Sequence, residues 1–171
     1  MLTIRPETPA DAAAICAVNT QAFGRDSEAR LVELVRASAH FVPELSLVAV
    51  DGGAPVGHIL FSGIVIRTAE KRIDALALAP MAVLPGWQGR GVGSALVRHG
   101  LEESVRLGHA IVVVVGHARY YPRFGFVPAR PRGLDAPFPV PDPSFMVQTL
   151  RPGALDGVRG TVEYPPAFSA V

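Results

Sequence analysis

The chain has a single cysteine, Cys16, among its 171 residues. One cysteine excludes an intrachain disulfide, and proteins without disulfides are typical of reducing compartments. The first residues do not form a basic stretch followed by an apolar one, so we expect no secretory signal peptide. Apolar runs are also short, since Ile111–Val115 falls far below the roughly 20 residues that span a bilayer. We therefore expect a cytoplasmic protein.

Lysine is nearly absent, so positive charge is carried almost entirely by arginine. Lys71 is the only lysine, and the formal net charge is +1. The sequence lacks a basic stripe with interleaved aromatics and a basic amphipathic helix, which would indicate nucleic acid or a lipid surface. We therefore expect neither nucleic acid nor a membrane as a partner. The arginines occur in small groups, such as the four between Arg119 and Arg132, which suit the phosphates of a small ligand.

Hydrophobic periodicity predicts alternating strands and helices, with no linker and no internal repeat. We expect strands at residues 2–5, 45–50, 56–66, 74–84, 111–115, 125–127 and 145–150, and helices at 8–23, 27–37, 94–107 and 117–124. The core-facing residues of two of these helices are expected to be Leu31, Leu34, Val35, Leu96, Val97, Leu101 and Val105. Pro80 cannot donate to a strand ladder, so it predicts a bulge or an open edge. This order predicts a single α/β domain over residues 1–171, with a mixed sheet and helices on both faces.

The most informative segment is a strand that leads through alternating glycines into a helix. Gly89, Gly91 and Gly93 allow several N–H groups to turn toward one point, beside the free N–H groups of the helix start. Such a loop binds phosphate or pyrophosphate. The Lys and Ser or Thr of a Walker loop are missing, and Ser94 stands where a dinucleotide fingerprint needs its last glycine. The pattern that is met is Q/R-x-x-G-x-G/A, which begins at Gln88.

Two segments resemble motifs of the GNAT superfamily of acetyltransferases. Val83–Ser94 resembles the acetyl-CoA motif, and Arg119–Phe126 resembles the second motif, in which a tyrosine precedes the glycine of a Gly-Phe pair by four residues. The segment 153–168 also resembles a bacterial subfamily of predicted N-acetyltransferases. The resemblance covers nearly the whole chain. It implies the GNAT fold, in which a mixed, mostly antiparallel central sheet is flanked by helices on both faces.

The resemblance also implies that acetyl-CoA is bound as the acyl donor and that no metal is needed. Backbone groups of Met81, Ala82 and Val83 would contact the pantetheine arm. The pyrophosphate would lie on the loop residues Gln88, Gly89, Arg90, Gly91, Val92, Gly93 and Ser94. For the side chains of Gln88 and Arg90, simple surface exposure is the alternative.

Acetyl transfer to an amine requires a neutral amine, a donor for the developing oxyanion and a proton for the departing thiolate. The resemblance implies that Tyr121 is the general acid, as in the family's second motif. It also implies that the N–H of Val83 is the oxyanion donor. Reference pKa values of about 10 for a phenol and about 8.5 for a thiol make this proton transfer nearly balanced. The alternative for Tyr121 is a ring that only packs under the coenzyme.

The general base is the least determined role. Many family members carry a carboxylate on the strand before the loop, but residues 75–83 include no ionisable side chain. His58 on the preceding strand is our candidate base, and His117 is a weaker one. A histidine on a strand is more often a hydrogen-bonded core residue. A water chain, or an amine that arrives neutral, would also serve.

We therefore expect an enzyme that acetylates a primary amine of a small molecule or of a protein terminus. The competing hypothesis is a non-catalytic acyl-CoA-binding regulatory module, which the missing carboxylate favours. Glu28 and the first two helices are expected on the acceptor side. The proline-rich stretch 136–143 either walls the acceptor site or forms a rigid surface crossover. A homodimer is compatible with the sequence, which does not determine the oligomeric state.

Overall fold

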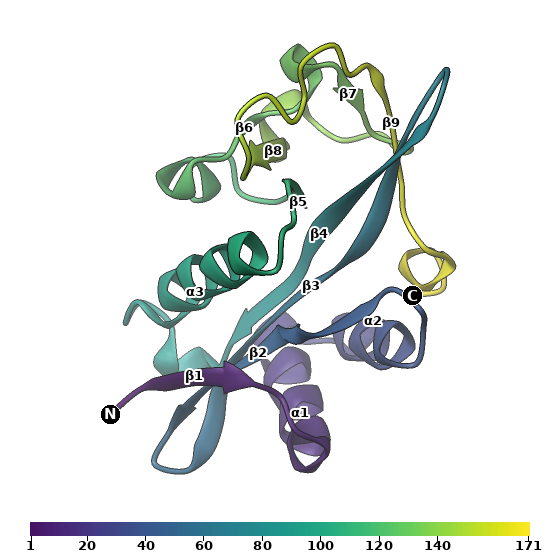
Figure 1. The fold of residues 1–171 in the computed structure, drawn as a ribbon. Helices are drawn as coiled ribbons and strands as arrows, with labels where there is room; N and C mark the ends of the chain where they lie inside the picture. Colours follow the sequence, from purple (N-terminus) through teal and green to yellow (C-terminus); the bar gives the residue numbers. More distant parts are fainter.

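The computed structural model describes residues 1–171 as one nine-stranded sheet with helices against both faces (Figure 1). The strand order is β1-β2-β3-β4-β5-β8-β6, and β9 pairs with both β3 and β7. Only the pairs β4–β5 and β7–β9 are parallel. The strands are β1 (Thr3–Pro6), β2 (Phe41–Asp51), β3 (Ala54–Thr68), β4 (Arg72–Val83), β5 (Ile111–Val115), β6 (Val127–Pro128), β7 (Leu134–Asp135), β8 (Phe145–Thr149) and β9 (Gly160–Glu163). The expected α/β fold with a mixed, mostly antiparallel sheet is confirmed.

Three α-helices cover the sheet, α3 on one face and α1 and α2 on the other (Figure 1). They are α1 (Ala12–Phe23), α2 (Ser27–Arg36) and α3 (Val92–Arg106). The short 3₁₀ turns are η1 (Pro9–Asp11), η2 (Pro85–Trp87), η3 (Tyr121–Phe124), η4 (Arg130–Arg132), η5 (Asp142–Ser144) and η6 (Pro166–Phe168). None of the helices combines the length and apolar character needed to cross a membrane.

Two expected core residues are on the outside of their helices. Leu34 is 41% exposed and Val105 is 53% exposed, so the expectation that they face the core is wrong. On α2 the buried stripe is centred on Val32 and Val35. On α3 the buried stripe includes Leu96, Gly100 and Ser104. At about 100° of rotation per residue, Leu34 and Val105 each fall beyond the edge of their stripe.

The long β3–β4 hairpin has the irregularity that Pro80 predicts. Ile59 pairs with Met81 and Phe61 with Leu78, so two β4 residues, one of them Pro80, oppose a single β3 residue. This is the arrangement of a β-bulge, which bends its strand and increases its twist. The expected bulge is confirmed, and it lies at the level where β4 separates from β5.

Two of the strands, β7 and β9, were not expected from the sequence. Strand β9 pairs with the end of β3, from Val65 to Thr68. This pairing brings the C-terminal segment back to the sheet face that carries α2. There Phe168 packs against the apolar cluster that α2 forms with the sheet.

Candidate active site

Strands β4 and β5 pair at only two positions, Leu76 with Val112 and Ala77 with Val113, and then diverge. A cleft of about 710 Å³ lies at this divergence. Most of the expected site residues line it: Met81, Val83, Gln88, Gly89, Gly91, Val92, Gly93, Ser94 and Tyr121. Ala82, Arg90 and His58 do not line it.

The loop between β4 and α3 presents unpaired backbone N–H groups to the cleft. Gly89 and Gly91 have φ values of +76° and +82°, which L side chains rarely adopt. The N–H groups of residues 89–94 donate to no acceptor of the chain, and the first helical bond runs from the Ala95 N–H to the Gly91 carbonyl at 3.0 Å. Free N–H groups at the start of a 15-residue helix form an anion-binding site.

The free edge of β4 also faces the cleft. The Gln88 Nε2 group donates to the Val83 carbonyl at 3.0 Å, while the Leu84 N–H donates to Val56 of β3. In a strand the N–H and C=O of one residue point to the same side, and successive residues alternate. The N–H groups of Val83 and Met81 therefore point into the cleft, and that of Ala82 points toward β3. The expected contact from the Ala82 backbone is thus not available.

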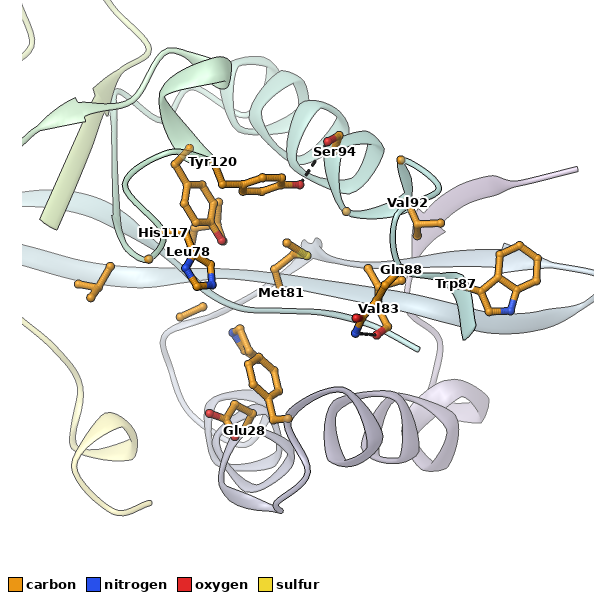
Figure 2. Close-up of a pocket in the computed structure, with 18 of the residues that line it drawn as sticks. Glu28, Leu78, Met81, Val83, Trp87, Gln88, Val92, Ser94, His117 and Tyr120 are labelled. Carbon is orange, nitrogen blue, oxygen red and sulfur yellow. Dashed lines mark hydrogen bonds between the residues drawn. The ribbon is translucent and has the colours of Figure 1, made fainter. Parts of the chain in front are cut away.

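The first turn of α3 packs closely over the cleft. A Cβ on Gly93 would lie 3.1 Å from the Tyr120 hydroxyl and 3.2 Å from Met81, so the absence of a side chain permits this approach. Ser94 and Tyr120 share a hydrogen bond of 3.2 Å between their hydroxyls, on the α3 side of β4 (Figure 2). The Arg90 guanidinium stacks on the Trp87 ring at 5.0 Å, and Arg90 itself does not line the cleft.

Tyr121 begins η3 and is only 7% exposed. Its ring meets those of Tyr120 and Phe126 edge-on, with centroids 5.1 and 5.8 Å away. Burial, and to a smaller extent Tyr120, raises the pKa of Tyr121 to about 12, so the phenol keeps its proton at neutral pH. Gly116 makes room for it, because a Cβ there would lie 2.4 Å from the Tyr121 ring. No sequence motif marks Gly116, so this role is not visible in the sequence.

His58 lies in the core and not in the cleft. It is fully buried, and its ring nitrogens are 3.2 Å from the Asn19 amide nitrogen and 3.0 Å from the Ser46 hydroxyl. Ser46 in turn donates to Glu7, which binds Arg36. Burial, and to a smaller extent Arg36, lowers the pKa of His58 to about 3. A neutral, enclosed imidazole has no path to a substrate amine, so the structure argues against His58 as the base.

Two ionisable side chains that do line the cleft are Glu28 and His117. Glu28 extends from α2 on the side of β4 opposite Ser94 and Tyr120 (Figure 2). Arg25 donates to both Glu28 oxygens, at 3.0 and 2.5 Å, and these bonds lower the pKa of Glu28. His117 follows β5, and its carbonyl accepts the Tyr120 N–H at 3.1 Å.

A family model described as an acetyltransferase (GNAT) domain matches residues 42–128. The chain belongs to the GNAT family. Among its relatives is the uncharacterized N-acetyltransferase YjhQ of Escherichia coli K12, 42% identical over 153 residues, 86% of this chain and 84% of YjhQ. Another is the uncharacterized N-acetyltransferase YhbS of the same strain, 35% identical over 169 residues, 98% of this chain and 99% of YhbS. The resemblance seen in the sequence is thereby confirmed.

Solved GNAT structures share the whole architecture. The crystal structure of YhbS from E. coli in complex with CoA has a TM-score of 0.91 at 34% identity, and covers 98% of this chain and 92% of YhbS. A GNAT family acetyltransferase from Brucella melitensis, in complex with acetyl-CoA, has a TM-score of 0.80 at 34% identity, with 98% of each chain covered. The expected enzyme class, an acyltransferase of the N-acetyltransferase type, is confirmed by this membership.

Proposed function

We propose that this protein transfers the acetyl group of acetyl-CoA to a primary amine by direct attack of the amine on the thioester. The observation that carries the proposal is the row of free N–H groups at residues 89–94, continuous with the free β4 edge and with Tyr121 in one cleft. The complexes of YhbS with CoA and of the Brucella protein with acetyl-CoA support the choice of coenzyme.

The chain's own groups fit such a coenzyme along its length. The N–H groups of the loop would bind the pyrophosphate, aided by the positive end of the α3 dipole. The Met81 and Val83 edge would pair with the amide groups of the pantetheine arm, as a strand pairs with its neighbour. Bound acetyl-CoA supplies an activated acyl group as its thioester.

In the reaction the amine nitrogen forms a bond to the acetyl carbon, and the carbon–sulfur bond breaks. The Val83 N–H donates to the acetyl carbonyl oxygen as negative charge develops there. The Tyr121 hydroxyl gives its proton to the departing sulfur, and its place in the cleft lining supports the role. Burial raises the pKa of this phenol to about 12, so the transfer is less favourable than the reference values suggest. The amine gives up one proton, which balances the proton that Tyr121 has lost.

For the group that takes this proton we propose His117, or a water molecule beside it, in place of His58. His117 lines the cleft, two residues beyond the end of β5. Glu28 is less suited, because its bonds to Arg25 hold it as a weakly basic carboxylate. The acceptor is a small molecule or a peptide terminus.

The second candidate function is a non-catalytic acyl-CoA-binding module. It is favoured by one observation, that the only carboxylate lining the cleft is already paired with an arginine. The two are separated by measuring thiol release from acetyl-CoA across a panel of amines, with Tyr121→Phe as the control. Amine-dependent release that falls in Tyr121→Phe supports the enzyme. CoA binding without release from any amine supports the module.

A further inference from the structure

A second cavity of about 790 Å³ adjoins the cleft of the proposed site. It lies on the sheet face that carries α2, between the β4–β5 region and the C-terminal segment around η6. Leu78, Ala79 and Val115 line both cavities. These three residues stand where β4 and β5 separate, so the second cavity opens toward the same gap as the coenzyme cleft.

The floor of this cavity leaves space above the sheet, because the residues that β4 presents there are small. Ala77 of β4 and Val113 of β5 are paired neighbours that line it. They belong to the apolar core on this face, while Leu76 and Val112 belong to the core under α3. An alanine methyl fills little of the space above a sheet, so the room remains for a ligand.

Aromatic rings form one wall. The Phe138 and Tyr164 centroids are 5.6 Å apart, and those of Tyr164 and Phe168 are 5.0 Å apart. Phe138 is 41% exposed and Val115 is 42% exposed, and in the adjoining cleft Phe23 is 40% exposed. Large apolar side chains that are exposed inside concave sites are typical of ligand-binding surfaces.

No carboxylate of either cavity is free to bind a cationic substrate. Glu163 is the only acidic residue of the second cavity, and Arg67 and Arg72 bind it at 2.6 and 3.0 Å. In the adjoining cleft Glu28 is held by Arg25 at 2.5 Å. A polycationic acceptor such as a polyamine would therefore meet paired carboxylates and additional arginines.

We propose that the second cavity holds the acceptor, and that the acceptor is a small primary amine with an aromatic or branched apolar body. This inference rests on the proposed function. The apolar body packs against Phe138, Tyr164 and Phe168, and the amino group extends past Ala79 and Val115 to the thioester. There its nitrogen bonds to the acetyl carbon, the sulfur leaves with the Tyr121 proton, and the amine proton passes to His117 or water.

The test is calorimetry of phenethylamine against the full chain saturated with CoA. Phe138→Ala removes one ring of the wall at an exposed position, so folding should be kept. Leu34→Ala is the matched control, because Leu34 is also 41% exposed and lies outside both cavities. We expect wild type and Leu34→Ala to bind equally, and Phe138→Ala to bind about tenfold more weakly. In Phe138→Glu the preference should shift from phenethylamine toward spermidine.

Equal binding of phenethylamine to wild type and Phe138→Ala would overturn the proposal, as would no binding at all. Tighter binding of spermidine or of a short peptide by the wild type would also overturn it. Acetyl transfer to the same amines is measured separately. If acetyl transfer favours spermidine or the peptide, and Phe138→Ala does not change the rate of transfer, the pocket assignment is contradicted. The proposed function is still supported in that case. Binding as expected but without transfer supports the pocket and contradicts the proposed function.

Discussion

Two glycines offer a matched test of the anion-binding loop. Gly91 and Gly53 have nearly the same φ, +82° and +80°, and a Cβ at either would meet nothing within 4 Å. Gly91 caps α3 within the proposed pyrophosphate site, and Gly53 lies in the turn between β2 and β3, outside the cleft. Replacing each by valine therefore imposes the same backbone strain at two functionally different places.

The strain alone should cost about 1–2 kcal/mol of unfolding free energy in each variant, because an L side chain is disfavoured in the left-handed region. In Gly91→Val the backbone either keeps its conformation and projects a branched side chain toward the anion, or relaxes and turns the N–H groups of the loop away. Both outcomes weaken CoA binding. We expect a Kd at least about tenfold higher, which is about 1.4 kcal/mol, and an unchanged Kd in Gly53→Val.

Calorimetry with CoA gives the affinity, and urea unfolding gives the stability of the same samples. The assignment of the loop as the pyrophosphate site fails if Gly91→Val binds CoA as tightly as the wild type while remaining folded. It fails equally if Gly53→Val loses as much affinity as Gly91→Val, since the effect would then be general destabilisation.

The other predictions concern the acid and the buried histidine. Tyr121→Phe should lower kcat roughly 100-fold with little change in CoA affinity; steady-state kinetics that stay within about threefold of the wild type would leave the ring as packing only. The pKa of His58 is about 3 in the folded state and about 6.5 when unfolded, so the unfolded state binds the extra proton as pH falls. The stability that comes from keeping His58 neutral is therefore fully present above pH 6.5. Titration of His58 should lower the unfolding free energy by about 3 kcal/mol between pH 6.5 and 4. Urea titrations should show this drop, and His58→Gln should show less of it; a flat wild-type profile would refute the assignment.

Local signals in the sequence were enough to predict the elements that build the coenzyme cleft. The bulge at Pro80 and the glycine loop before α3 each depend on residues adjacent in the chain. Backbone conformation at such positions is decided locally, by the freedom of glycine and the missing donor of proline. Most of the expected loop residues line one cleft with Tyr121, and Arg90 does not.

Features that depend on distant partners were not predicted. Strand β9 has only four residues and forms because the end of β3 offers an edge about a hundred residues earlier in the chain. His58 was assigned to the cleft because strand periodicity does not reveal that Asn19 and Ser46 enclose its ring. The aromatic wall likewise joins Phe138 to Tyr164, which no periodicity connects.

Acetyl transfer by this protein is tested most directly by incubating it with acetyl-CoA and a panel of primary amines. The free thiol and the acetylated amine are both measured by mass spectrometry. We expect equal amounts of CoA and N-acetylated amine, formed only when protein and amine are both present. Tight CoA binding with no acetylated amine from any member of the panel would contradict the proposed function.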